Sequence, residues 1–231
     1  YRYFETIPGA AEKVSYPFGF GLSYTDFRWE ILSSRQVEDR ICVTVKVENT
    51  GACAGREVMQ LYVSAPQGKL GKAARSLVAF QKTRLLQPGQ TQELTLECPI
   101  YAMASYDDLG KVAKSAYVLE KGAYTFHVGN SVRNTACCDY VYRVAEDEIL
   151  QQLSTKLAPH CLKKRMLSDG SFEPLPAFPN VQYTAQPVAE VERTNPQEPL
   201  PLSAVAEGKL TLDGFYYEVS INGKKTEHSA D

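Results

Sequence analysis

One uncharged, aromatic-rich stretch organises the sequence around it: Tyr16-Pro17-Phe18-Gly19-Phe20-Gly21-Leu22-Ser23-Tyr24-Thr25. Its large aromatic side chains would each bury about 150–250 Å² when packed, which is more apolar area than a solvated loop carries. Two glycines so close together would each cost a helix about 1 kcal/mol. These residues therefore predict an extended, packed arm that leads into a β domain. The two-residue period of extended chain would place on one side of the arm Phe18, Phe20, Leu22 and Tyr24.

Short alternating runs follow the arm and are separated by turn residues. Apolar residues at 41, 43, 45 and 47 alternate with polar ones, which indicates a half-buried strand. Gln87-Pro88-Gly89-Gln90 has the form of a type II turn, and Glu120-Lys121-Gly122 between two runs predicts a tight hairpin. About seven such strands at roughly ten-residue spacing predict an all-β fold, an antiparallel sandwich of the immunoglobulin type.

The two ends of the chain differ in pattern from this middle part. Tyr1-Arg2-Tyr3-Phe4 reads as the end of an aromatic strand whose sheet is missing, and residues 146–157 fit either a short helix or an extended strap. Seven of the 13 prolines lie between Pro174 and Pro201, which predicts for residues 160–202 a stiff, polyproline II-like chain without sheet or helix. Two turn signals, Asp213-Gly214 and Asn222-Gly223, predict a hairpin around residues 215–221.

Composition limits the class of protein and its partners. The 231 residues are 44% hydrophobic with a net charge of −2, which is typical of a globular protein and gives no reason to expect nucleic acid or a membrane as partner. No run approaches the ~18 apolar residues of a membrane span. Six cysteines without a CxxC spacing favour reduced thiols, and hence a reducing, cytoplasmic compartment. The first residue, Tyr1, suggests a piece cut from a longer chain.

Five motifs in a fixed order resemble the fibronectin type III-like domain of family 3 glycoside hydrolases, the β-glucosidase family. After the arm come Val47-Glu48-Asn49-Thr50-Gly51, Gly55-Arg56-Glu57-Val58-Met59-Gln60-Leu61-Tyr62-Val63, Leu86-Gln87-Pro88-Gly89 and Gly122-Ala123-Tyr124-Thr125-Phe126-His127-Val128-Gly129. The resemblance favours the strap for residues 146–157. It implies an interdomain arm over residues 1–24, ending a preceding α/β domain, and a sandwich over residues 25–159.

The remaining residues resemble the connector of the permuted subgroup, in which an α/β sandwich domain, the fibronectin-like domain and then a barrel succeed one another. The matching residues are Lys164-Arg165-Met166-Leu167-Ser168-Asp169-Gly170-Ser171, Glu173-Pro174-Leu175-Pro176 and Glu207-Gly208-Lys209-Leu210-Thr211-Leu212-Asp213. The sequence then implies a Pro-rich linker over residues 160–202. Residues 203–231 would be the truncated start of a following domain or a non-native tail.

The resemblance also implies a parent enzyme that hydrolyses β-glycosides with retention, which requires two carboxylates about 5–5.5 Å apart. In the family the nucleophilic aspartate lies in the barrel and the acid/base glutamate usually lies in the α/β domain. We therefore assign no catalytic, cofactor-binding or metal-binding residue in this chain. Local candidates have plainer explanations: Asp107-Asp108 as a solvated or turn-capping pair, His127 as a polar-face residue, and His160-Cys161 as part of a linker.

The sequence thus predicts a non-catalytic accessory domain that packs against the α/β sandwich and barrel domains of the parent. The residues expected to form its interface arm are Tyr16, Pro17, Phe18, Phe20, Leu22 and Tyr24. A loop at 65–74 or 99–114 could reach the substrate cleft, so contact with carbohydrate would be indirect. Two alternatives are a surface adhesion-type interaction module and a carbohydrate-binding module, to whose aromatic platform Tyr62, Tyr101 and Tyr106 could contribute.

Overall fold

The computed structural model describes residues 1–154, 163–175, 192–194, 216–221 and 224–228. The chain divides into two units, Tyr1–Ala177 and Phe178–Asp231. Among the described residues, no helix is long and apolar enough to span a bilayer.

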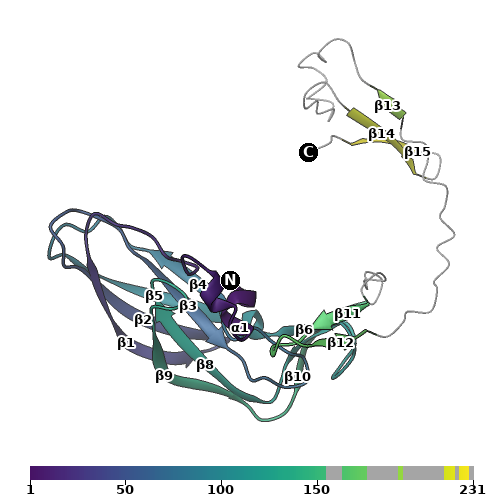
Figure 1. Cartoon of the computed structure of the whole chain (residues 1–231), viewed down its shortest axis with the longest axis horizontal. Coiled ribbons are helices and arrows are strands. Elements are labelled where there is room, and N and C mark those ends of the chain that lie inside the picture. Colours follow the sequence, from purple (N-terminus) through teal and green to yellow (C-terminus); the bar gives the residue numbers. More distant parts are fainter. Residues whose placement is uncertain (155–162, 176–191, 195–215, 222–223, 229–231) are drawn as a thin grey trace. The chain divides into compact units, whose positions relative to one another are not determined.

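Two antiparallel sheets form the body of the first unit (Figure 1). The first sheet has the order β1-β2-β5, from β1 (Phe27–Val37), β2 (Arg40–Asn49) and β5 (Thr91–Pro99). The second has the order β4-β3-β8-β9, from β3 (Val58–Ser64), β4 (Ser76–Lys82), β8 (Gly122–Gly129) and β9 (Thr135–Val144). The predicted all-β antiparallel sandwich is confirmed.

The core lies between these sheets and follows from the alternation in the sequence. On β2 the side chains of Ile41, Val43, Val45 and Val47 are fully buried, and the residues between them stay partly exposed. Burial of an aliphatic side chain of this size is worth about 1.5–3 kcal/mol. From the second sheet the residues that complete this core include Met59, Leu61, Val63, Tyr124, Phe126 and Val128.

The turn predicted at Gln87–Gln90 is confirmed, because Gln90 N–H donates to the Gln87 carbonyl at 2.9 Å and Gly89 has a φ of +78°. The hairpin predicted at Glu120–Gly122 is wrong. The preceding strand β7 (Ala116–Leu119) pairs with β6 (Ser105–Asp107) and with β10 (Glu148–Gln152), not with β8. Glu120 is buried and Gly122 has a φ of +141°, so the chain crosses here from a small sheet into the second sheet of the sandwich.

Strand β10 resolves the alternative left open at residues 146–157: the described part is an extended strap, not a helix. The N-terminus differs from its prediction, because residues 2–6 form the short helix α1 (Arg2–Thr6), followed by the 3-10 helix η1 (Ala11–Lys13). A hydrogen bond of 3.0 Å from Glu5 N–H to the Tyr1 carbonyl closes the helical turn. The strand end predicted at residues 1–4 is therefore wrong. A second 3-10 helix, η2 (Ile100–Met103), links β5 to β6.

Strands also occur where a stiff, sheet-free chain was predicted. β11 (Lys164–Met166) pairs antiparallel with β12 (Phe172–Pro174), and β13 (Glu192–Thr194) belongs to the second unit. The β11–β12 hairpin forms because the first proline within residues 160–202 is Pro174, at the end of β12. Gly170 supplies the φ of +86° that the turn of this hairpin needs. Most of residues 176–215 lie outside the described residues.

The second unit contains the sheet β13-β14-β15. Its strands β14 (Tyr216–Ile221) and β15 (Lys224–His228) pair antiparallel across the Asn222-Gly223 signal, which confirms the predicted hairpin. The boundaries proposed at residues 24, 159 and 202 stay predictions.

Candidate domain interface at the N-terminal arm

The arm is fixed to the outer face of the second sheet at Phe18. The Phe18 ring stacks on Tyr1 with centroids 4.4 Å apart, and the Tyr1 ring meets Tyr62 edge-on at 6.3 Å. Val132 N–H donates to the Phe18 carbonyl at 2.9 Å, and Leu77 N–H donates to the Tyr1 hydroxyl at 2.7 Å. These contacts explain why Tyr62 is fully buried on the outer side of the sheet, where burial raises its pKa.

Gly19 makes a turn in the arm. Its φ is +87°, and Phe20 N–H donates to the Pro17 carbonyl at 3.0 Å. A Cβ at this position would lie 2.6 Å from the Gln60 amide and 2.9 Å from the Ser131 Cα, so the backbone approaches the sheet as closely as glycine allows. The expectation of an extended arm with one apolar side is therefore wrong. Phe18 stacks on Tyr1, whereas Phe20 stacks on Tyr16 at 4.9 Å.

The rest of the arm faces solvent. We call Tyr16, Phe20, Leu22 and Tyr24 the arm surface; their exposed fractions are 68%, 48%, 94% and 99%. Phe18 is 42% exposed and Pro17 is half-buried. On α1, Tyr3 and Phe4 form a further exposed aromatic pair, with centroids 5.2 Å apart. Large exposed apolar side chains that lie close together are typical of interaction surfaces.

A groove of about 740 Å³ runs beside the arm surface. Its apolar wall includes Phe20 and Leu22, and its polar wall includes Glu57, Asn130 and Arg133. The Asn130 amide donates to Glu57 Oε2 at 3.0 Å, while Arg133 pairs with Glu5 at 2.8 Å. A hydrogen bond within the polar wall and an ion pair from the wall to Glu5 therefore hold these side chains in place.

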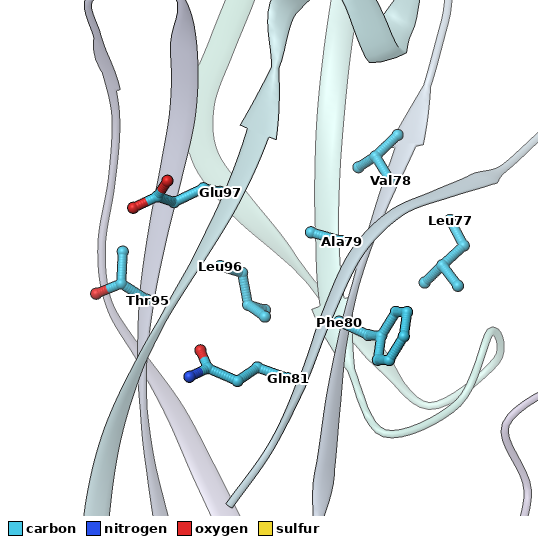
Figure 2. A pocket seen from close by; sticks show the side chains of 8 residues that line it. All are labelled: Leu77, Val78, Ala79, Phe80, Gln81, Thr95, Leu96 and Glu97. Carbon is cyan, nitrogen blue, oxygen red and sulfur yellow. The ribbon is translucent and has the colours of Figure 1, made fainter.

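A second hollow, of about 500 Å³, lies between the edge strands β4 and β5 (Figure 2). Leu96 points into the space between the strands, whereas Thr95 and Glu97 point to the other side of β5 (Figure 2). Phe80 of β4 is 69% exposed. The sequence pattern did not indicate this hollow, because the sequence of a strand does not show whether the strand lies at the edge of its sheet.

The loop at 65–74 is held by a buried carboxylate that sequence reasoning missed. Glu120 is 2% exposed and accepts hydrogen bonds from Lys69 N–H at 2.5 Å and Leu70 N–H at 3.3 Å. Its carboxylate also forms an ion pair with the buried Lys72 ammonium. Residues 120–122 read as a surface turn, so nothing in the sequence indicated burial there.

The loop within 99–114 is organised by Asp107, which is fully buried rather than solvated. Its carboxylate accepts four backbone N–H groups, those of residues 110, 111, 112 and 113, at 2.7–3.1 Å. Burial alone would raise the pKa of Asp107, but these four donors together outweigh burial and lower it. The turn-capping role is confirmed. The neighbouring Asp108 pairs with Arg165 at 2.7 Å, and the reach of either loop toward a substrate stays a prediction.

The other candidates named from the sequence are His127 and His160-Cys161. His127 lies half-buried on the outer face of β8, where burial and the nearby Arg75 lower its pKa, and His160-Cys161 lies outside the described residues. The five cysteines of the described ranges are free thiols, with Cys98 and Cys138 buried. Within the same ranges no three His, Cys, Asp or Glu side chains gather as a metal site would require.

Comparison with known proteins places this fold in a family. Residues 57–132 match the model of the fibronectin type III-like domain. Over 191 residues the chain is 52% identical to β-glucosidase A of Butyrivibrio fibrisolvens, a match that covers 76% of this chain and 23% of that protein. The chain contains a fibronectin type III-like domain whose relatives are β-glucosidases of family 3.

Two further β-glucosidases match nearly the whole chain. A β-glucosidase of Ruminococcus albus is 40% identical over 230 residues, which is 96% of this chain and 24% of that protein. A solved β-glucosidase of Paenibacillus barengoltzii superposes with a TM-score of 0.71 at 40% identity, covering 92% of this chain and 25% of that one. The chain thus spans about a quarter of the length of these relatives, and the Ruminococcus albus match includes most of the residues that follow the sandwich.

Proposed function

We propose that this chain is the non-catalytic accessory domain of a retaining β-glucosidase and that it holds the α/β sandwich and barrel domains of that enzyme in position. The hydrolysis of O-glycosyl bonds would take place in those domains. The observation that carries the proposal is the arm surface, an apolar set of side chains on a backbone that is itself fixed to the sandwich.

The lengths of the relatives support this assignment. Proteins named β-glucosidase are about four times as long as this chain, which covers 23–25% of them. The remainder of such a protein would supply the domains that cover the arm. A positioning role would strongly affect the catalytic rate, because a displacement of about 1 Å between catalytic groups can lower the rate ~10²-fold.

The buried carboxylates support a structural role for the domain itself. Among the described residues, Asp107 and Glu120 are the buried ones, and each is satisfied by backbone N–H groups, with Lys72 as a further partner of Glu120. Both therefore fix loops. Exposed and buried free thiols lead us to propose a reducing, cytoplasmic compartment for the protein.

A double variant, Leu22→Ser with Tyr24→Ser, tests the proposal in the longer enzyme and in this chain alone. Both side chains are almost fully exposed here, so the isolated chain should keep its stability within about 0.5 kcal/mol. In the longer enzyme each lost contact would cost about 1.5–3 kcal/mol of docking. We expect a lower kcat/KM on a chromogenic β-glucoside and a lower melting temperature.

Phe80→Ser is the matched control, because Phe80 is a large exposed aromatic on a different part of the sandwich. It should leave both readouts unchanged. An arm variant that behaves like the control in the longer enzyme would refute the proposal. Turnover of the same glucoside by the purified 231 residues would also refute it.

A further inference from the structure

Three tyrosines gather on one face of the small sheet β6-β7-β10. Tyr106 of β6 and Tyr117 of β7 lie directly opposite each other in the antiparallel register, with ring centroids 5.4 Å apart. Tyr101 from η2 places its ring 5.2 Å from that of Tyr117. Tyr101 is 46% and Tyr106 40% exposed, and Tyr117 is half-buried between them. We call Tyr101, Tyr106, Tyr117 and Gln151 the tyrosine cluster.

Gln151 completes the row on the third strand. It is the register partner of Tyr117 on β10, and its Oε1 accepts a hydrogen bond from the Tyr101 hydroxyl at 2.6 Å. Across the described part of the chain, neither the Gln151 amide NH₂ nor the hydroxyls of Tyr106 and Tyr117 form a hydrogen bond with another protein group. The cluster therefore offers aromatic faces together with neutral donors and acceptors that the described residues leave unoccupied.

This combination matches the two surfaces of a sugar ring. A pyranose presents a patch of C–H groups, which suits the electron-rich face of an aromatic ring, and a rim of hydroxyls, which need donors and acceptors such as tyrosine hydroxyls and an amide. None of the four side chains of the cluster carries a charge, so the chemistry selects a neutral ligand. The rings are tilted by 48° and 56° against each other, which makes a curved cradle rather than a plane.

We propose that the tyrosine cluster binds a short, neutral oligosaccharide, with the sugar rings stacked on Tyr101 and Tyr106 and the hydroxyls held by Gln151 and the phenol groups. A curved cradle suits a soluble chain of a few sugars better than the flat face of a crystalline polymer. The alternative platform named from the sequence included Tyr62, which is fully buried and takes no part. It did not include Tyr117 or Gln151, because only strand pairing brings Tyr117 beside Tyr106 and Gln151 beside Tyr117.

Calorimetric titration of the 231-residue chain with cellotetraose, laminaritetraose and maltotetraose tests the site. The choice of glucose oligomers rests on the proposed function, whereas the site itself does not. We expect saturable binding of at least one of them, with a weak Kd on the order of 1 mM. Tyr106→Ser should weaken it at least about fivefold through loss of a stacking ring. Tyr101→Phe, which keeps the ring and removes the hydrogen bond to Gln151, should have a smaller effect.

Two control variants keep the result interpretable. Phe80→Ser removes an exposed aromatic outside the cluster, and the arm double variant Leu22→Ser with Tyr24→Ser tests the other surface; neither should alter the Kd. Equal weakening by Phe80→Ser, or unchanged binding in Tyr106→Ser, would overturn the proposal. So would the absence of saturable binding up to about 10 mM, which corresponds to less than ~3 kcal/mol of binding free energy. Any of these results would leave the scaffold role intact, because that role depends on the arm surface.

Discussion

Replacement of Gly19 by alanine should loosen the arm from the sandwich. The φ of +87° costs a residue with a Cβ about 1–2 kcal/mol. The new methyl would also lie 2.9 Å from the Ser131 Cα and 2.6 Å from the Gln60 side chain. Gln60 cannot move cheaply, because it donates to the Asn130 carbonyl at 2.9 Å and accepts a hydrogen bond from the Tyr62 hydroxyl. Overpacking of this kind adds about 1–3 kcal/mol.

We therefore expect Gly19→Ala to lower the free energy of unfolding, or of local arm release, by about 2–5 kcal/mol. Two other glycines separate the contributions. Gly9 has a φ of +71° with open space around its Cβ, so Gly9→Ala reports the backbone cost alone. Gly21 has neither a positive φ nor a neighbour within 4 Å, so Gly21→Ala should be neutral or stabilising by up to about 1 kcal/mol.

The assay is urea unfolding of the purified chain, combined with hydrogen exchange at the Phe20 amide, which donates to the Pro17 carbonyl. Gly19→Ala should speed exchange at Phe20, and Gly21→Ala should not. If Gly19→Ala proved as harmless as Gly21→Ala in both readouts, the turn and its close approach to the sheet would not exist in solution. The reasoning about an anchored arm would then be refuted.

Three further predictions concern buried groups. Asp107→Asn should cost about 1–3 kcal/mol, because four backbone donors lose a charged acceptor. Since the folded-state pKa of Asp107 is lowered, the wild type should lose stability as the pH falls below about 4 toward that folded pKa. The urea midpoint of the variant should fall less over the same pH range. Lys72→Met should destabilise the protein by about 3–5 kcal/mol, because it leaves the Glu120 charge buried without its ion-pair partner. The double variant Lys72→Met with Glu120→Gln should recover part of this loss in thermal unfolding. A double variant no more stable than Lys72→Met would contradict this prediction. Burial raises the pKa of Cys98 to about 12, so iodoacetamide at pH 8 should modify the exposed Cys137 well before Cys98 in a time course read by peptide mass spectrometry, and equal rates would contradict the burial.

The sequence predicted the sandwich well because its core strands carry their own evidence. The alternation at residues 41–47 admits one half-buried arrangement, and Gly89 after Pro88 specifies one type of turn. The features that the sequence did not predict depend on contacts between residues far apart in the chain. Tyr1 became part of a helical turn, in which its ring could stack on Phe18, and no local pattern predicts that stacking. Glu120 looked like a surface turn residue because the lysine that neutralises it lies 48 positions away in the chain.

The interface role of the arm stays a prediction, and its expected extended shape was wrong. Its composition indicated packing against something, and the exposure of Leu22 and Tyr24 agrees with an unpartnered surface. The turn at Gly19 depends on the close approach of Gln60 and Ser131, which follow it by 41 and 112 positions in the sequence. Periodicity within the arm carries no information about such an approach.

Hydroxyl-radical footprinting of Leu22 and Tyr24 tests the central claim most directly, by comparing this chain alone with a longer β-glucosidase that contains it. Both side chains are more than nine-tenths exposed here, so they should oxidise rapidly in the isolated chain. In the longer enzyme we predict strong protection of both, while Phe80 keeps its reactivity. Equal oxidation of Leu22 and Tyr24 in the two proteins would contradict the account.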